Sequence, residues 1–207
     1  MIRYMTIFLL FFLNTQVLAI QPSSAMTAPV PGSKRFLSEK YFDILSEIHP
    51  AWVHTITAMN YKERIVTLDD GSEWKMSYWF SGNPKSWEIG DQVTISWHGD
   101  STYFLDIKLK NHTKKDYGWA TIKETPQVNN SGFLYIEHLQ NRMSLQLNNG
   151  VNVTSKKNWM FNNFREGDVV ITLYNKESTF ESSYALWDVN SHLIAEDLIL
   201  NSQTSSQ

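Results

Sequence analysis

From Trp52 onward, short runs of alternating apolar and polar residues are separated by turn residues. Alternation with a period of two places one side of a strand in a core and the other in solvent, so each run is typical of a half-buried β-strand. The Asp70-Gly71 pair between two of the runs is typical of a tight hairpin turn. The first six runs predicted as strands cover residues 53–60, 64–68, 72–78, 92–97, 102–109 and 117–123.

The same order of motifs appears twice, with an offset of about 80 residues. Leu68-Asp69-Asp70-Gly71 returns as Leu147-Asn148-Asn149-Gly150, and Gly90-Asp91 returns as Gly167-Asp168. The further matched pairs are Trp79 with Trp159, Trp87 with Phe164, and Leu105-Asp106-Ile107 with Trp187-Asp188-Val189. We therefore predict two tandem units, residues 50–123 and 131–200, joined by a linker at 124–130 and followed by a tail at 201–207.

The fold class predicted from this pattern is all-β, with two tandem small barrels. Each unit has about 70 residues, and a flat sheet of that size would leave its edge strands exposed, which favours closure into an SH3-like or OB-like barrel. A short helix is predicted ahead of the barrels, over residues 36–49. Its apolar residues recur at helical spacing between Leu37 and Ile48, with Ser38 as the N-cap and Pro50 after the last turn.

The first residues are typical of a secretory signal peptide. Arg3 precedes an apolar run, and small residues follow at the positions where cleavage would occur. The predicted signal peptide covers residues 1–19, with residue 25 as an alternative end, and a flexible leader rich in Pro, Ser and Ala follows over 20–35. The apolar run is shorter than the roughly 20 residues that a spanning helix needs, so no transmembrane anchor is predicted. We expect an exported protein, periplasmic or secreted.

Composition and charge exclude several kinds of chemistry. The 207 residues contain no cysteine, which excludes disulfides, thiol nucleophiles and cysteine-ligated metals. Eighteen Lys and Arg against 21 Asp and Glu give a formal net charge of -3, so no overall positive field attracts nucleic acid. No nucleic-acid partner and no cofactor are predicted.

One pattern resembles a known group of proteins. Leu68-Asp69-Asp70-Gly71-Ser72-Glu73-Trp74, followed by Trp87-Glu88-Ile89-Gly90-Asp91-Gln92-Val93-Thr94-Ile95, is similar to a small β-domain motif of signal-bearing bacterial proteins to which no activity is assigned. The second unit matches only in outline, because Val153 stands in the place of Trp74 and Phe164 in the place of Trp87. The resemblance implies an export signal and a small β-domain, and it supplies no catalytic residues.

Three acidic residues in the first unit, Asp69, Asp70 and Glu73, could be calcium ligands because calcium takes several carboxylate and carbonyl oxygens. The second unit has asparagine at each corresponding place: Asn148, Asn149 and Asn152. Turn formation explains both copies, whereas a metal explains only one. The sequence therefore predicts a turn here and no metal site.

Histidine and lysine residues offer two other hypotheses. His98 and Asp100 could form an acid-base pair in one turn, but the second unit has no matching histidine and no catalytic motif is present. A hydrolase whose site is assembled from distant residues stays an alternative.

A basic hairpin carries Lys108, Lys110, Lys114 and Lys115 with His112 near its tip. It could bind an anionic partner, but protection of an exposed edge strand is the favoured interpretation.

The chain contains eight Trp, more than the filling of two small barrel cores requires. Exposed rings in the irregular connections would form an apolar patch that binds peptide, glycan or another subunit, whereas buried rings would close the barrel ends. The candidate ligand-binding residues are Trp79, Phe80, Trp87, Trp159, Phe161 and Phe164. We expect an exported, non-enzymatic binding or protein-interaction module whose partner is a protein, peptide or glycan. An envelope assembly or structural component is the first alternative.

Overall fold

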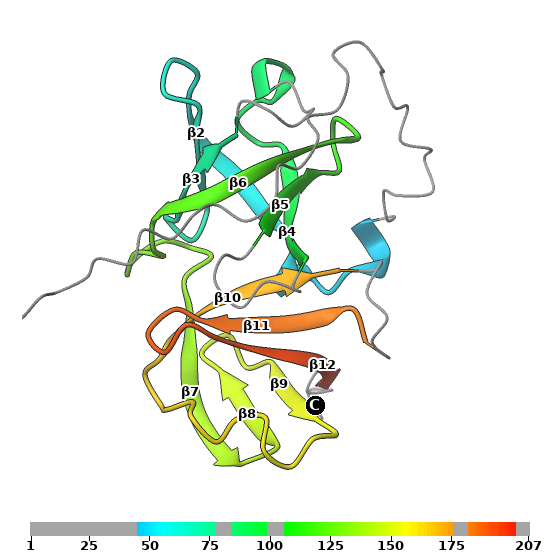
Figure 1. The fold of residues 1–207 in the computed structure, drawn as a ribbon. Coiled ribbons are helices and arrows are strands. Elements are labelled where there is room, and N and C mark those ends of the chain that lie inside the picture. The colour runs from blue at the N-terminus through cyan, green and yellow to red at the C-terminus, as the bar shows by residue number, and fades with distance from the viewer. Residues whose placement is uncertain (1–44, 78–83, 99–105, 176–181, 202–207) are drawn as a thin grey trace, which may run out of the picture. The chain divides into compact units, whose positions relative to one another are not determined.

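The computed structural model describes residues 45–77, 84–98, 106–175 and 182–201, and in them it shows two closed antiparallel barrels in tandem (Figure 1). Each barrel has six strands, which confirms the predicted all-β class. The predicted signal peptide and leader lie outside the described residues, as do the residues from 36 to 44 of the predicted helix. Within the rest of that range the chain forms one 3-10 turn instead, η2 (Leu45–Glu47), and a second, η3 (Pro50–Trp52), follows it.

The first barrel consists of two three-stranded meanders. The strands are β1 (His54–Asn60), β2 (Ile65–Leu68), β3 (Glu73–Met76), β4 (Gln92–His98), β5 (Asp106–Asn111) and β6 (Asp116–Glu124). Their order around the barrel is β1-β2-β3-β6-β5-β4, and pairing of β1 with β4 closes it. Because β5 and β6 each pair on both sides, the basic hairpin is not at a sheet edge, and its predicted role in protecting an edge is wrong.

The second barrel repeats this strand order. Its strands are β7 (Leu134–Asn141), β8 (Ser144–Leu147), β9 (Asn152–Ser155), β10 (Val169–Tyr174), β11 (Tyr184–Asp188) and β12 (Leu193–Asn201). The order β7-β8-β9-β12-β11-β10, closed by pairing of β7 with β10, is equivalent to that of the first barrel.

Strand register corrects one of the matched pairs between the copies. Asn111 lies opposite Val93, three residues after Gly90, and Asp188 lies opposite Val170, three residues after Gly167. The structural counterpart of Asp188 is therefore Asn111 rather than Asp106. An apolar-Asp-apolar pattern alone matched the wrong register, because only the pairing with the neighbouring strand determines which residues are equivalent.

Each hairpin turn after the second strand follows the same local chemistry. Gly71 and Gly150 have φ of 82° and 81°, a left-handed conformation that a glycine adopts without steric cost. The residue before each glycine accepts a hydrogen bond from the backbone N–H two positions on, Asp70 from Ser72 at 2.8 Å and Asn149 from Val151 at 3.2 Å. This turn chemistry explains why both copies keep Asp or Asn before glycine.

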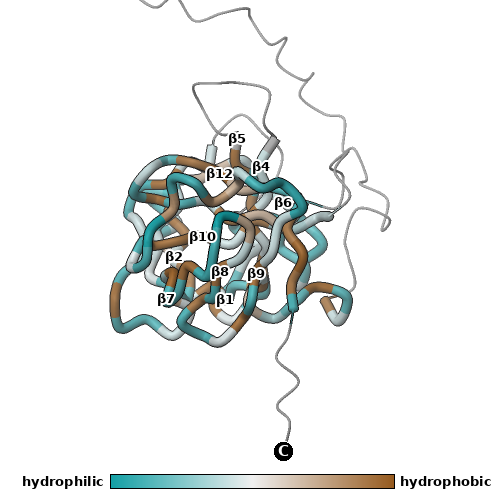
Figure 2. The backbone as a smooth tube through the Cα atoms, turned by 90° about the horizontal axis from the view of Figure 1, so that it is seen from below, coloured by the Kyte–Doolittle hydropathy of each residue, from teal (hydrophilic) through white to brown (hydrophobic). Residues whose placement is uncertain are grey.

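Apolar and polar segments alternate along the chain of both barrels (Figure 2). In β3, β8 and β9 every second residue is buried, as the alternation predicts, whereas in β2 every residue except Thr67 is buried. The aromatic residue that precedes each Gly-Asp turn belongs to the core of its own barrel: Trp87 is 0% exposed and Phe164 is 3% exposed. Each barrel core therefore contains one large aromatic ring from this position.

The two barrels share core residues. In β10, Val170 and Tyr174 lie in the core of the second barrel, whereas Ile171 and Leu173 lie in the cluster that forms the core of the first barrel. In the other direction, Trp52 lies in the core cluster of the second barrel, and its indole Nε1 donates to the carbonyl of Ala185 at 3.1 Å. Each barrel therefore completes the apolar burial of the other.

Replacement of Ile171 by Ala tests this shared core. The side chain is 0% exposed and lies between the barrels, so its truncation is expected to lower the free energy of unfolding by about 2–5 kcal/mol. The measurement is urea unfolding, followed by tryptophan fluorescence and by far-ultraviolet circular dichroism. We expect one coincident transition in the wild type and in the variant. Two separated transitions in the wild type would contradict the shared core.

Candidate functional site

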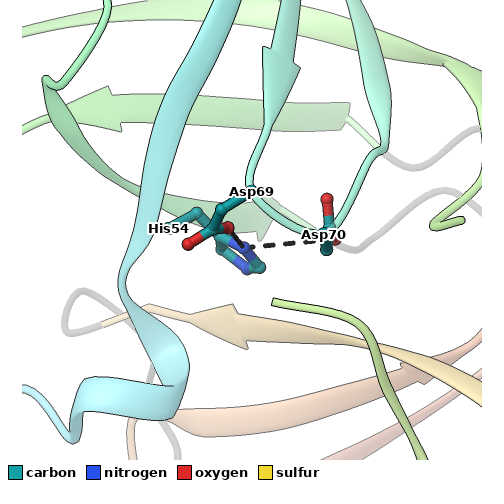
Figure 3. A group of neighbouring side chains, drawn as sticks. All are labelled: His54, Asp69 and Asp70. Atoms are coloured by element: carbon teal, nitrogen blue, oxygen red, sulfur yellow. Dashed lines mark hydrogen bonds and ion pairs between the residues drawn. The ribbon is translucent and has the colours of Figure 1, made fainter. Parts of the chain in front are cut away.

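One histidine and two aspartates converge at the start of the first barrel (Figure 3). His54 is the first residue of β1 and is 3% exposed, and Asp69 and Asp70 form the turn between β2 and β3. The Nδ1 atom of His54 lies 3.1 Å from Oδ1 of Asp69 and 4.0 Å from Oδ2 of Asp70. We call these three residues the His54 cluster.

Hydrogen bonds to the turn hold Asp70 in place. Its Oδ1 atom accepts from the backbone N–H of Ser72 at 2.8 Å and from the Ser72 hydroxyl at 2.6 Å. The Ser72 oxygen in turn accepts from the indole Nε1 of Trp74 at 2.7 Å, and both residues are 0% exposed. The carboxylate orientation is therefore determined by buried neighbours rather than by solvent.

The cluster also joins the two barrels. His54 Nε2 lies 3.1 Å from the hydroxyl of Thr172 on β10. The connection after β6 lies on the same turn, because the N–H of Gln127 donates to the carbonyl of Asp70 at 2.8 Å and that of Gly132 donates to the carbonyl of Asp69 at 3.0 Å. A Cβ atom on Gly132 would lie 2.7 Å from Oδ1 of Asp69, so the close approach requires glycine there.

Two opposing effects act on the imidazole. Burial by itself lowers the pKa of His54, because it penalises the charged form. The hydrogen bond with Asp69 and the negative charges of Asp70 and Asp69 outweigh burial, and the pKa of His54 is raised. The arrangement thus favours a positive charge at Nδ1.

The second copy lacks this cluster. By strand register, Leu134 takes the place of His54, because Leu134 lies opposite Val170 as His54 lies opposite Val93. Asn148, in the place of Asp69, instead accepts from the N–H of Tyr135 at 3.1 Å and donates to the carbonyl of Phe133 at 3.1 Å. The sequence singled out Asp69 and Asp70 but missed His54, because no regular spacing links a histidine to a turn fifteen residues later.

Glu73 does not belong to the cluster. Its carboxylate pairs with Lys123 across the β3–β6 ladder, with Oε2 at 3.0 Å from Nζ. The three acids that the sequence offered as calcium ligands are thus divided between a buried turn and a strand pair.

A second pair of buried acids lies in the second barrel. Asp188 is 0% exposed and accepts from the N–H of Asn190 at 2.8 Å, while Asp168 accepts from the N–H of Arg165 at 2.7 Å. Burial raises the pKa of Asp168, and the neighbouring Asp188 carboxyl adds to this effect. The first barrel has no such repulsion between two buried carboxylates, because Asn111 stands in the place of Asp188. Its amide Nδ2 donates to Asp91 at 2.8 Å.

Three of the six predicted ligand-binding aromatics are buried. Trp87, Phe161 and Phe164 are 0%, 0% and 3% exposed. Of the two alternatives that the sequence left open, these three rings follow the buried one, and they belong to the barrel cores, where the apolar area of each ring is removed from water. Trp159 is 59% exposed. Trp79 and Phe80 lie outside the described residues.

The basic hairpin does not present a set of unmatched positive charges. Lys108 Nζ lies 4.8 Å from the ring centroid of Tyr117 and 5.1 Å from that of Trp119. Lys110 is 3% exposed, and Lys114 Nζ pairs with Glu88 at 2.8 Å. The proposed His98 and Asp100 pair lies outside the described side chains.

Trp159 lies on the connection between β9 and β10, which is hydrogen-bonded to the turn between β7 and β8. The N–H of Phe161 donates to the carbonyl of Arg142 at 3.2 Å, and the N–H of Ser155 donates to that of Met143 at 2.8 Å. Met143 is 38% exposed, and Lys157 Nζ lies 5.9 Å from the Trp159 ring centroid. We define the Trp159 surface as Arg142, Met143, Lys156, Lys157 and Trp159.

This part of the chain is basic although the whole protein is acidic. Between Glu137 and Glu166 the sequence has four Lys or Arg residues and no Asp or Glu. The Trp159 surface thus combines an exposed ring, a flexible apolar side chain and positive charge.

A groove of about 500 Å³ lies against the second barrel. Its apolar lining includes Ile48, Tyr184 and Leu198. His49 also lines it, and burial lowers the pKa of that histidine, whose Nδ1 accepts from the N–H of Ala51 at 3.2 Å. The His54 cluster does not line this groove.

Among the described residues, no helix has the length and apolar character that crossing a membrane requires. Comparison of the chain with protein-family models, with curated proteins and with solved structures finds no match.

Replacement of Asp188 by Asn tests the buried acid pair. The amide can donate to Asp168 as Asn111 donates to Asp91, so we expect a gain of about 1 kcal/mol in unfolding free energy at pH 7. A carboxyl whose folded pKa is raised destabilises the fold as pH rises above its ordinary pKa of about 4, and the penalty is complete above the raised value. The gain, measured by urea unfolding, should therefore shrink towards pH 3.

The reciprocal variant in the first barrel is Asn111→Asp. It places two carboxyls together beside Asp91 and is expected to cost about 2 kcal/mol at pH 7, with a smaller loss in acid. If Asp188→Asn instead lowers the unfolding free energy equally at pH 7 and pH 3, Asp168 and Asp188 do not repel each other in the folded protein.

Proposed function

We propose that this protein is an exported, non-enzymatic interaction module that binds another protein through the Trp159 surface. The observation that carries the proposal is the exposure of Trp159, because six other tryptophans in the described residues are buried or half-buried. An indole ring buries a large area on contact and is enriched among the residues that dominate binding energy. Export is supported by the signal-peptide pattern of residues 1–19.

The loop that carries Trp159 is anchored directly after the ring. Met160 and Phe161 are 8% and 0% exposed, and the N–H of Asn162 donates to the Trp159 carbonyl at 3.1 Å. An exposed ring on an anchored loop loses little conformational freedom on binding, which favours affinity.

The neighbours of the ring indicate the partner's chemistry. Trp, Met and Arg are enriched at protein–protein interfaces, and all three lie on the Trp159 surface. Its positive charge favours a partner segment that carries Asp or Glu beside an apolar side chain, because complementary charge speeds encounter and selects the partner. An acidic protein segment is thus the partner that this surface fits.

The positions of the titratable clusters support a binding role rather than an enzymatic one. The residues of the His54 cluster and of the Asp168–Asp188 pair are engaged in hydrogen bonds with neighbouring residues. The groove of about 500 Å³ is lined by neither.

The test is capture of partners from envelope and culture-supernatant fractions with the immobilised mature protein and with Trp159→Ala. A hot-spot ring contributes about 2 kcal/mol or more, so the variant should recover a specific partner with about 30-fold lower affinity. Because Trp159 is exposed, the variant's unfolding free energy should stay within about 0.5 kcal/mol of the wild type.

Ile89→Ala is the matched control, since Ile89 is 69% exposed on the first barrel. It should recover the partner as the wild type does. A Lys156→Glu, Lys157→Glu double variant should also lose the partner. Equal recovery by wild type and Trp159→Ala would rule out the Trp159 surface. Capture of a glycan, or of a second copy of this chain, would replace the acidic protein partner.

A further inference from the structure

We propose that His54, Asp69 and Asp70 bind a divalent transition-metal ion of the zinc type at the joint between the two barrels. One imidazole nitrogen and two carboxylate oxygens, one from each residue, lie within 4.8 Å of one another (Figure 3). A tetrahedral zinc ion with bonds of about 2.0–2.2 Å needs donors roughly 3.4 Å apart. The distances from His54 Nδ1, 3.1 Å to Asp69 and 4.0 Å to Asp70, lie on either side of that value.

Two of the three ligands, His54 and Asp70, are each held by a second partner that leaves a donor atom facing the centre. His54 Nε2 meets the hydroxyl of Thr172 at 3.1 Å, as a metal-bound histidine typically donates its other N–H to an oxygen. Asp70 uses Oδ1 for Ser72, so Oδ2, the oxygen nearer to His54, remains for the ion. His54 and Asp70 are therefore oriented before the ion arrives.

Charge also favours a cation. Two carboxylates face a single imidazole, which leaves a net charge of -1 even when the imidazole is protonated. A dipositive ion with two carboxylates and a neutral imidazole makes the centre neutral, which suits a site where His54 and Asp70 are 3% and 1% exposed.

Binding is an exchange of a proton for the metal. The proton on His54 Nδ1 passes to solvent, and the freed lone pair forms the coordinate bond, while Nε2 keeps its proton towards Thr172. A water molecule takes the fourth position. The Asp69 side chain is 21% exposed and offers the ion a route from solvent.

The donor set distinguishes between metals. Calcium takes six to eight oxygen ligands and magnesium keeps several waters, so three protein donors that include a nitrogen fit neither well. Imidazole and carboxylate together suit zinc and cobalt. The proposal thus differs from the calcium hypothesis of the acidic turn in both ligands and metal.

The experiment uses the full mature chain without an affinity tag, stripped of metal with EDTA. Isothermal titration with zinc chloride should give one equivalent per chain, and cobalt chloride should give the visible absorption bands of a tetrahedral centre. Zinc should raise the Tm by about 5 °C when it is in excess over its dissociation constant. Calcium chloride at the same concentration should produce none of these changes.

Two ligand variants and one control complete the design. His54→Gln and Asp69→Asn should each weaken zinc binding at least 10-fold and abolish the cobalt spectrum. His138→Gln removes an exposed histidine that pairs only loosely with Glu166, at 3.9 Å, and should bind zinc as the wild type does. Asp69→Asn keeps the side-chain size, so it reports on the metal site even if His54→Gln does not fold.

Absence of zinc binding to the wild type, or binding that survives in Asp69→Asn, would overturn the proposal. An octahedral cobalt spectrum would also overturn it. Loss of zinc binding in His138→Gln would assign the zinc to a surface site instead.

Discussion

Burial of both sides of β10 and β11 is the constraint on which the rest of the structure depends. Ile171 and Leu173 point to the core of the first barrel, while Val170 and Tyr174 lie in the core of the second. Separation of the barrels would expose the first pair to water, at a cost of about 1.5–3 kcal/mol for each side chain. A chain without disulfides thus obtains from a shared core the stability that a barrel of this size has difficulty supplying alone.

The polar contacts at the joint follow from this packing. His54, the first residue of β1, can reach Thr172 because the shared core packs β10 against the first barrel, and the connection after β6 lies over the Asp69–Asp70 turn at hydrogen-bond distance. An imidazole and two carboxylates are thereby enclosed in one place. Duplication supplied two similar units, but only the first carries the His54 cluster, since the second has Leu134 and Asn148 at these positions.

In the second barrel, the connection before the Gly-Asp turn exposes Trp159 and buries Phe161 and Phe164. Aromatic content alone could not separate these rings, because all three belong to one short segment of the sequence. Only the folded chain decides which of them lie in the barrel core.

The alternation of apolar and polar residues and the repeated glycine turns determined the all-β class and the two barrels, since both are local signals with a fixed period. Asp70 and Asn149 were likewise readable as turn residues, because each bonds to the backbone only two positions away. Tertiary structure alone decided that His54 meets Asp69, that Asp188 corresponds to Asn111, and that Ile171 belongs to the other barrel's core. These relations join residues from different strands, and a periodic pattern places a side chain on a face without stating what lies opposite that face.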